Sequence, residues 1–509
     1  MSVPIVLNGT NLGIYRLVRY SRGREFRFDL SEESKTGIAA ARQVVEKALA
    51  VGDPVYGLTT GLGAKVTRRL SDEEQEAFSY QTLRGRGHSL GEPMPVEVIR
   101  GSMITRLNTL ALGVSGASPH LGEFIRECLN RHLTPVVGCR GSIGAGDLCW
   151  GATMGLAFLG EGRMYDPRHR IVPAREALRS AGLPPLEPGP KDGLVLANHS
   201  SFSATLSAFA VHEASVLIDA AQAATAMTMQ AFRANPSPLD PFVAGLSGHP
   251  GVVEAAGTLR QLRGAEPAGS GRARGIQDPL SIRNAAQVHG AALSALKFAR
   301  SIVNAELNAP SDSPVVDVEK QRIVSSGGFY TAHLTVAVET VSRSVLQLAV
   351  TQLARMEKLL SHRFSGLPRF LASPGANSNG FAPVMKLAES MLGEIKMLTA
   401  PVDHWPGVNA DGMEDIQPNS PLAAQSLRKA LALCRHLSAM EMMFSAQALE
   451  LSGQLDRSSL VIIELYTAVR AVVPRLDNDR PMGEEIEALA DKIEQAELPC
   501  VGKPGNPAA

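Results

Sequence analysis

Apolar and polar positions follow one another along much of the chain with the spacing of long α-helices. Between residues 334 and 360, Val338, Val341, Val345 and Leu348 occur at successive steps of three, four and three. This spacing places the four side chains on one face of a helix, as in helices that pack in a bundle. We therefore expect a long amphipathic helix in this part of the chain.

Three further stretches predict helices of similar length, at 201–232, 278–307 and 420–451. The first is rich in Ala, Ser and Met and is nearly apolar on all sides, so we expect it to be central and buried. Strand-like alternation is short and lies mostly in the first 60 residues and at 320–326. The predicted fold class is mainly α, a bundle of long helices with a loop-built active site and a small mixed N-terminal part.

Along the chain we expect three consecutive parts. They are an N-terminal domain at 1–200, a central long-helix bundle at 201–455 and a C-terminal helical tail at 456–509. Glycine-rich polar loops interrupt the helical pattern, among them YGLTTGLGAK (56–65), TLRGRGHSLGEP (82–93) and GSIGAGDL (141–148). Loops on a rigid scaffold are where catalytic and binding residues are concentrated.

The composition narrows the range of partners. Lys plus Arg and Asp plus Glu both number 50, which gives no electrostatic case for nucleic acid or for an acidic membrane. The five cysteines are scattered and form no CxxC pair, as is typical of thiols in a reducing compartment. We find no signal-peptide pattern and no apolar run of about 20 residues. We therefore expect a cytoplasmic protein with neither a nucleic-acid nor a membrane partner.

Several common kinds of site do not fit the motifs. Lys65 follows Ala64 and precedes Val66, so the glycine-rich loop at 56–65 does not match the P-loop pattern. The 12 histidines form no HExxH pair, so we expect no metal site. No GxSxG elbow is present for a serine hydrolase.

Six short motifs instead match one family jointly and in order. They are YGLTTGLG, GSIGAGDL, LVLANHSSFSATLS, QDPLSIR, SDSPVV with SSGGF, and GMEDIQ. Together they resemble the histidine and phenylalanine ammonia-lyases, an aromatic amino acid lyase superfamily, over about residues 35 to 450. The resemblance implies a long-helix bundle of the ammonia-lyase and fumarase-like type. It also implies a homotetramer in which neighbouring subunits complete each active site.

The chain departs from this family at the residues that form its electrophile. In the family, an Ala-Ser-Gly triplet cyclises and loses water to give methylidene-imidazolone, and the serine supplies the departing hydroxyl. Here the turn is Gly144-Ala145-Gly146-Asp147, with no serine. The tyrosine of the QDPYS motif, a catalytic base in the family, is Leu280 here. We therefore expect no methylidene-imidazolone and no other cofactor.

Other family positions are retained around the catalytic step. Tyr56 matches the second active-site tyrosine, and a phenol can transfer a proton when its surroundings shift its pKa. Arg283 matches the arginine that clamps the substrate carboxylate, a task suited to a planar guanidinium. Asn198 and Gln277 match amides that line the same pocket. The competing interpretations are packing for Tyr56, a surface ion pair for Arg283 and helix capping for Asn198.

A second group of residues points to the ring of the substrate. His88 aligns with the histidine that histidine lyases use against the imidazole ring, and Glu414 aligns with their ring-binding glutamate. Lys386 and Lys65 have no clear family counterpart and are either surface lysines or partners for an anionic substituent such as a thiolate. We assign the thiolate role to Lys386 for preference. Tyr330 is expected to form a wall of the pocket.

These residues predict a carbon–nitrogen lyase that eliminates an amine without the family's electrophile. A quaternary ammonium leaves as a neutral amine, so a histidine-derived betaine suits such an enzyme. The chain is in this respect similar to members of the superfamily described as ergothionases, which release trimethylamine from ergothioneine. The predicted catalytic residues are Tyr56, Glu414 and Lys386, and the predicted substrate-binding residues are His88, Asn198, Gln277, Arg283, Tyr330 and Lys65.

Three alternatives remain open at this point. The chain is a conventional histidine or aromatic amino acid ammonia-lyase if the missing serine is an artefact. It is otherwise an electrophile-free lyase or isomerase on another amino acid, which would keep Arg283 without needing His88 and Glu414 together. The third alternative is a binding paralogue without turnover.

Overall fold

The long helices predicted from the sequence are present in the computed structural model, which describes residues 4–63, 66–264, 273–375, 377–402, 407–499 and 501. Helices α9 (Ser201–Phe232) and α17 (Ser420–Leu451) have the predicted bounds. Helix α14 (Ala332–Leu360) contains the predicted apolar stripe, and all four of its side chains are buried. The prediction of a mainly α fold is confirmed.

The prediction of a single helix at 278–307 is wrong in one respect, because two helices are present there. The chain forms a short helix α12 (Leu280–Arg283) and then α13 (Ala285–Glu306), with a break at Asn284. Asn284 has φ −98° and ψ 23°, outside the helical range. The apolar periodicity of the sequence continues across Asn284, and for this reason the periodicity did not reveal the break.

Two compact units divide the chain, each assembled from several stretches. Unit 1 comprises residues 1–210, 300–338 and 401–425, and unit 2 comprises 211–299, 339–400 and 426–509. Four of the five boundaries fall within the long helices α9, α13, α14 and α17, and the fifth lies between Ala400 and Pro401. The three consecutive domains expected from the sequence stay a prediction.

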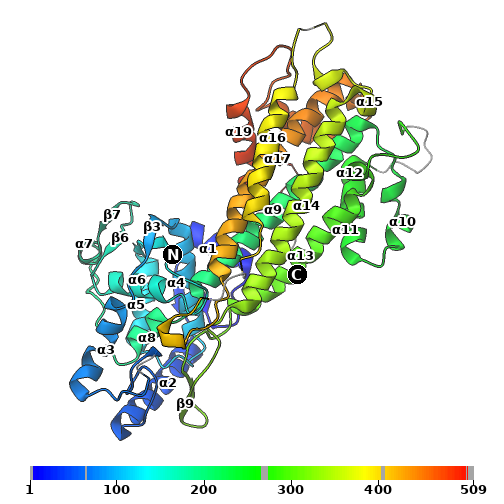
Figure 1. Cartoon of the computed structure of the whole chain (residues 1–509). Helices are drawn as coiled ribbons and strands as arrows, with labels where there is room; N and C mark the ends of the chain where they lie inside the picture. Colours follow the sequence, from blue (N-terminus) through cyan, green and yellow to red (C-terminus); the bar gives the residue numbers. More distant parts are fainter. Residues whose placement is uncertain are drawn as a thin grey trace. The chain divides into compact units, whose positions relative to one another are not determined.

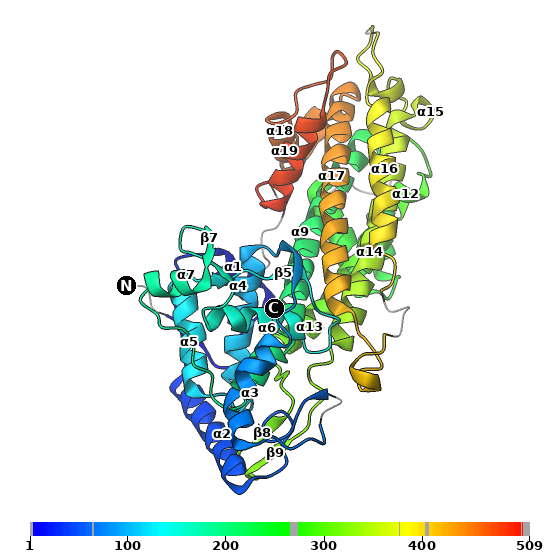
Figure 2. The ribbon, with the colours of Figure 1, turned by 60° about the vertical axis from the view of Figure 1, so that its left-hand side comes forward.

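The elements of unit 1 are short helices and small sheets (Figures 1 and 2). Its helices are α1 (Ile14–Arg22), α2 (Glu32–Val51), α3 (Asp72–Arg84), α4 (Val96–Leu110), α5 (Pro119–Asn130), α6 (Leu148–Phe158), α7 (Ala174–Ser180) and α8 (Asp192–Ala197). Its strands are β1 (Ile5–Leu7), β2 (Phe28–Leu30), β3 (Leu90–Pro93), β4 (Thr134–Pro135), β5 (Gly138–Arg140), β6 (Arg163–Tyr165), β7 (Ile171–Pro173), β8 (Val315–Asp317) and β9 (Arg322–Val324).

The strands pair in small sheets: β1 with β2 in parallel, β3 with β5, β6 with both β4 and β7, and β8 with β9. Strands β3 to β7 lie outside the stretches where the sequence predicted strands. None of them is longer than four residues, which is too short to display a repeating alternation.

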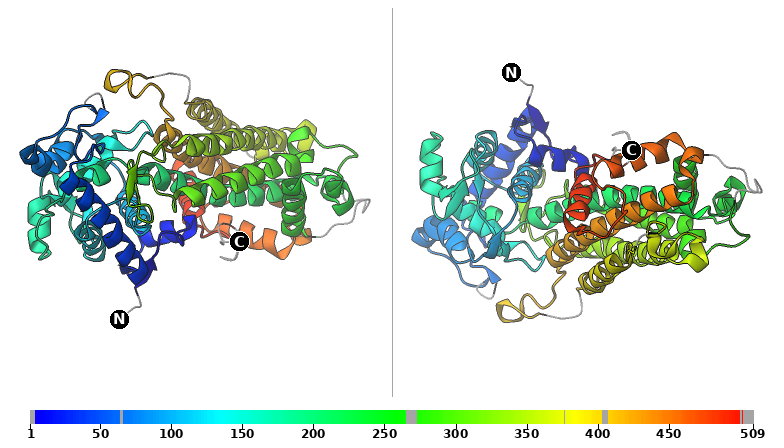
Figure 3. Two further views of the ribbon diagram at one scale, coloured as in Figure 1. Left: turned by 90° about the horizontal axis from the view of Figure 1, so that it is seen from below. Right: turned by 90° about the horizontal axis from the view of Figure 1, so that it is seen from above.

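In unit 2, the long helices α9, α14 and α17 lie side by side (Figures 1 and 3). This unit also contains α12 and most of α13. Its other α-helices are α10 (Pro241–Gly245), α11 (Pro250–Arg263), α15 (His362–Ser365), α16 (Ala382–Leu398), α18 (Leu460–Arg470) and α19 (Gly483–Glu494). The part of the chain that the structure describes contains one helical stretch, Asp192–Phe232, that is apolar enough to cross a membrane by length and composition. Because 89% of its most apolar window is buried, it has the character of a core helix.

A buried ion pair joins α14 to α17 inside unit 2. The guanidinium of Arg355 donates to both carboxylate oxygens of Glu441, at 2.6 and 2.9 Å, and both side chains are fully buried. Thr228 of α9 also donates to Glu441, at 2.8 Å. A charge buried in this way is tolerated only when it is paired and hydrogen-bonded. The pair therefore fixes the register of three long helices.

This arrangement predicts a large loss of stability on breaking the pair from one side. Replacement Glu441→Gln leaves the Arg355 charge buried without its partner, and we expect it to lower the free energy of unfolding by about 3–5 kcal/mol. The matched control is Glu254→Gln, whose partner Lys297 is at the surface, 2.6 Å away. We expect that change to cost less than about 1 kcal/mol. Equal losses by the two variants in denaturant unfolding would contradict this role of Glu441.

Candidate active site

A cavity of about 780 Å³ lies within unit 1 and is lined mostly by loops, with further residues from α3, α6 and α8. Four of the residues singled out in the sequence line it: Tyr56, Asn198, Tyr330 and Glu414. Ala145 of the glycine-rich turn forms part of the same wall. Motifs far apart in the sequence are thus brought to one place.

The turn at 144–146 is held by the backbone on both sides. The Gly146 N–H donates to the Phe329 carbonyl at 3.1 Å, and the Gly144 carbonyl accepts from the N–H and the hydroxyl of Thr331, at 3.2 and 2.7 Å. Ala145 forms a β-bridge with Tyr330. The turn therefore lies in a fixed position against the segment that carries Tyr330.

The carboxylate of Asp147, next to the turn, holds it in place through hydrogen bonds to two serines. It accepts hydrogen bonds from the Ser142 hydroxyl at 2.5 Å and from the hydroxyl and N–H of Ser203, at 2.7 and 2.8 Å. Burial raises the pKa of Asp147, and these hydrogen bonds act in the opposite direction. Since Ser203 belongs to the first turn of α9, the carboxylate ties the turn to a long helix.

Asn198 approaches the turn so closely that a side chain would not fit there. Gly146 has φ +85°, and a Cβ added to it would lie 2.1 Å from Oδ1 of Asn198. The next residue along, His199, donates its N–H to the Gly146 carbonyl at 2.9 Å. Asn198 ends α8, where its N–H donates to the Leu194 carbonyl at 2.8 Å. The amide of Asn198 is thereby placed beside the turn at the cavity wall.

Tyr56 and Tyr330 present phenol rings to the cavity. The Tyr56 hydroxyl accepts a hydrogen bond from the Gly63 N–H at 3.1 Å, which holds the ring across its own glycine-rich loop. Burial, and secondarily the charge of Asp415, raises the pKa of Tyr330. Tyr330 is therefore a neutral phenol at physiological pH.

Glu414 lies in a small turn of its own and keeps its carboxylate available. Its N–H and carbonyl exchange hydrogen bonds with Asn409, at 3.2 and 2.8 Å. Its charge contributes to raising the pKa of the neighbouring Cys149 thiol, although burial is the larger cause. The carboxylate is thus near the cavity without an ion pair in the described part of the chain.

Ser313 of the SDSPVV motif lines the cavity, and two buried cations form hydrogen bonds with the residues on either side of it. Arg106 donates to both oxygens of Asp312, at 3.1 and 2.6 Å, and to the Val195 carbonyl at 2.7 Å. Lys191 donates to the Pro314 carbonyl at 3.0 Å, and burial lowers the pKa of its ammonium to about 8. Two charged side chains therefore position the residues on either side of Ser313.

None of the other predicted residues that the structure describes lines this cavity. His88 is exposed and does not line the cavity, although its backbone N–H contacts the Cys149 thiol. Gln277 and Arg283 are hydrogen-bonded to each other in unit 2, where Leu280 is exposed. Lys65 lies outside the described residues. The roles given to these residues stay predictions.

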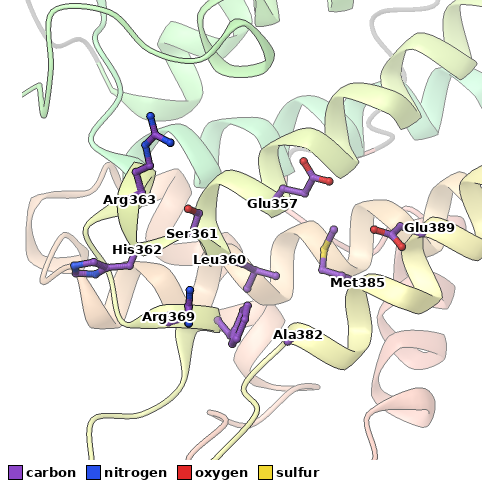
Figure 4. Close-up of a pocket in the computed structure, with 10 residues that line it drawn as sticks. Glu357, Leu360, Ser361, His362, Arg363, Arg369, Ala382, Met385 and Glu389 are labelled. Atoms are coloured by element: carbon purple, nitrogen blue, oxygen red, sulfur yellow. The ribbon is translucent and has the colours of Figure 1, made fainter.

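Lys386 is an exposed residue of α16 in unit 2. The neighbouring residues Met385 and Glu389 face a separate cavity of about 660 Å³, shown in Figure 4. That cavity lies among α14, α15 and α16, and Lys386 is not one of the residues that line it. The catalytic role of Lys386 is thus without support from a contact with any residue that the structure describes.

The cavity of unit 1 also contains polar residues that were not predicted from the sequence. They are Arg68, Glu74, Gln81, Arg86, Ser325, Ser326 and Asp415. Arg68 forms an ion pair with Glu74, whereas Arg86 has no carboxylate partner among the described residues. Arg86 belongs to the glycine-rich loop at 82–93, and the presence of that loop was the sequence feature that could have indicated Arg86 as a site residue. A cation in this place offers a second group for a substrate carboxylate.

The close approach of Asn198 to the turn predicts that Gly146→Ala will impair turnover. The new Cβ must displace either the Asn198 amide or the turn itself. Gly162→Ala is a matched control, because Gly162 also has φ +85° but has no atom within 4 Å of the added Cβ. We expect both variants to lose about 1–2 kcal/mol of stability through backbone strain. Only Gly146→Ala should lower kcat/KM, and equal kcat/KM values for the two would contradict the prediction.

Comparison with known proteins agrees with this geometry. Residues 12–471 match the family model for aromatic amino acid lyases. The chain is 34% identical to a histidine ammonia-lyase of Gloeobacter violaceus, covering 97% of this chain and 96% of that protein. It is 32% identical to a histidine ammonia-lyase of Myxococcus xanthus, covering 98% of each.

Solved structures show the same fold. An ergothionase from Treponema denticola, in complex with desmethyl-ergothioneine sulfonic acid, superposes with a TM-score of 0.92 at 25% identity, over 97% of this chain and 99% of that one. A histidine ammonia-lyase from Trypanosoma cruzi gives a TM-score of 0.89 at 26% identity, over 97% and 94% of the two chains. The chain therefore belongs to the aromatic amino acid lyase family and is a carbon–nitrogen lyase.

Proposed function

We propose that this lyase eliminates an amine from a histidine-derived betaine without a methylidene-imidazolone group, with ergothioneine as the first candidate substrate. The observation that carries the proposal is the Gly144-Ala145-Gly146 turn, which lies in the cavity wall and has no hydroxyl side chain. Its Gly146 N–H donates to Phe329. A group that forms by cyclisation and loss of a serine hydroxyl does not fit these residues.

The lining of the cavity supports a cationic substrate. Aromatic rings of Tyr56, Phe78, Phe329 and Tyr330 share the wall with the carboxylates of Glu414 and Asp415. Quaternary ammonium groups bind favourably over aromatic faces and near carboxylates. A trimethylammonium group is both the recognised cation and the leaving group in this proposal.

The elimination balances without an external electrophile. A base removes a proton from Cβ, and the electron pair of that C–H bond forms the Cα=Cβ double bond. The Cα–N bond breaks at the same time, and its electron pair leaves with neutral trimethylamine. The products are a urocanate-type acid, trimethylamine and a proton on the base. Tyr56 is the group we assign to proton transfer.

The remaining roles follow the family resemblance. Asn198 and Arg283 hold the carboxylate with Gln277, and Glu414 holds the ring. The resemblance gives His88 the same ring-binding role, although His88 does not line the cavity of this chain. Lys386 neutralises the sulfur, and Tyr330 forms the wall. The resemblance implies a homotetramer in which neighbouring subunits complete each active site, and we propose that a neighbouring copy presents Arg283, Gln277 and Lys386. The predicted cytoplasmic location belongs to the same proposal.

A conventional histidine ammonia-lyase is the second candidate. The relatives at 34% and 32% identity carry that activity in their names, which favours it. It requires the electrophile, and the missing serine counts against it. The two candidates differ in the amine that they release.

The decisive experiment is incubation of the purified full chain with ergothioneine, hercynine and histidine in parallel. We expect trimethylamine from at least one betaine, together with the ultraviolet absorbance of a urocanate-type product. We expect no ammonia from histidine. Release of ammonia from histidine at the betaine rate, or faster, would refute the electrophile-free proposal, and absence of turnover with both betaines would refute the substrate assignment.

Intact mass tests the prosthetic group independently of any substrate. We expect the purified chain to have the mass of the unmodified sequence, because no serine at 144–146 is present to dehydrate. Borohydride should accordingly leave the activity unchanged. A mass lower by the mass of water in the peptide that contains Gly146 would contradict the proposal.

A further inference from the structure

A second polar cavity of unit 1, of about 380 Å³, has no part in the chemistry proposed above. It lies among the end of α1, the start of α4, strand β4 and the β6–β7 turn, and it shares no lining residue with the candidate active site. The basic residues that line it are Arg22, Arg24, Arg100, His132 and His169.

Arg100 is the central feature of this cavity. Its side chain is 5% exposed, and its Nη1 donates to the Leu129 carbonyl at 3.0 Å. Its Nε and Nη2 are buried and have no hydrogen-bond partner in the described part of the chain. The guanidinium carbon lies 5.8 Å from the centre of the Phe28 ring. Burial is the main cause that lowers the pKa of Arg100, to about 10, so the group is still a cation at neutral pH.

No carboxylate of the described residues compensates this charge. Asp166 lines the cavity, but it accepts from the Arg170 side chain at 2.8 Å and from the N–H groups of Arg168 and Arg170, at 2.8 and 2.9 Å. Glu97 is the other acidic residue of the lining and forms no ion pair with Arg100. A buried cation without a partner costs several kcal/mol. The geometry is that of a site whose counter-ion comes from outside the chain.

The groups around Arg100 add positive charge instead of removing it. Arg24 donates to the Pro167 carbonyl, and the Arg22 guanidinium carbon lies 5.6 Å from the centre of the Phe209 ring. Neither arginine pairs with a carboxylate among the residues that the structure describes. Burial, followed by the charges of Arg100 and Arg24, lowers the pKa of His132 to about 4, so His132 is neutral. Three guanidinium groups therefore face the cavity, and among its lining residues only the carboxylate of Glu97 is not already bound to another arginine.

We propose that this cavity binds a small phosphate-type anion, either free phosphate or the phosphate group of a small metabolite, with Arg100 as its buried anchor and Arg22 and Arg24 at its mouth. Guanidinium groups bind phosphate oxygens with pairs of parallel hydrogen bonds. A dianion matches the three cations better than a single carboxylate does. The buried hydroxyl of Thr134 and the Tyr165 phenol supply further donors.

The test is thermal unfolding of the full chain with inorganic phosphate, at constant ionic strength maintained with chloride. A ligand that binds only the folded state raises Tm in proportion to the logarithm of its concentration above Kd. We expect this shift in the unchanged protein and in the control Arg16→Gln, an exposed arginine of α1 outside the cavity. We expect the shift to be lost in Arg24→Gln and Arg100→Met.

For Arg100→Met we expect a second result, which would not be observed if Arg100 had only a structural role. Without phosphate, the variant should be at least as stable as the unchanged protein, because it removes an uncompensated buried charge. Calorimetric titration should give a Kd for inorganic phosphate at least tenfold weaker in Arg24→Gln than in Arg16→Gln. Since Arg24 is exposed, that variant keeps the test valid even if Arg100→Met fails to fold.

The proposal is overturned if phosphate raises Tm equally in all four proteins, which is the result of general salt exclusion from protein surfaces. It is also overturned if acetate at the same concentration stabilises as well as phosphate. Tighter binding of glucose 6-phosphate or adenosine monophosphate than of inorganic phosphate supports a phosphorylated metabolite. The reverse order supports free phosphate. No lyase assay enters this test, so its outcome is separate from that of the proposed substrate.

Discussion

The carboxylate of Asp147 is the constraint on which the candidate site depends. A fully buried acid is costly unless its oxygens accept hydrogen bonds, and here Ser142 and Ser203 supply three of them. Ser142 lies before the glycine-rich turn, and Ser203 lies in the first turn of α9. One side chain therefore joins the glycine-rich segment to a long helix. The turn at 144–146 keeps its shape for this reason, whatever chemistry takes place beside it.

The same principle extends to the other loops of the site. Arg106 and Lys191 are buried cations, and each donates to the segment around Ser313, Arg106 to the Asp312 carboxylate and Lys191 to the Pro314 carbonyl. Gly146 and Asn198 approach so closely that the turn and the end of α8 fix each other. Each loop is thus held by a hydrogen-bonded buried group instead of by its own regular structure. Arg100 of the same unit differs in that it has no carboxylate partner among the described residues, and two of its donors are buried without a partner.

The long helices could be predicted from the sequence because their periodicity extends over many turns. The bounds of α9 and α17 agree with the predicted ranges, whereas the break at Asn284 and strands β3 to β7 depend on local geometry that no repeating pattern encodes. Family motifs predicted residues that the structure does bring together, as Tyr56, Asn198, Tyr330 and Glu414 show. They did not identify Arg86, and no motif identifies the cavity around Arg100. Both depend on side chains from distant segments that meet only in the folded chain.

In the proposed reaction, which uses no electrophile, the substrate must supply a leaving group that needs no activation. An amine that leaves as a neutral molecule needs no activation, so the enzyme need only orient the substrate and remove a proton. In that reaction, the aromatic rings and carboxylates that line the cavity would stabilise the quaternary ammonium while it is bound. Neutral trimethylamine loses that attraction, because it no longer carries the charge. The same lining would therefore favour binding of the betaine and release of the amine. This asymmetry is a physical reason for a turn that keeps its glycines and its Asp147 anchor without the serine.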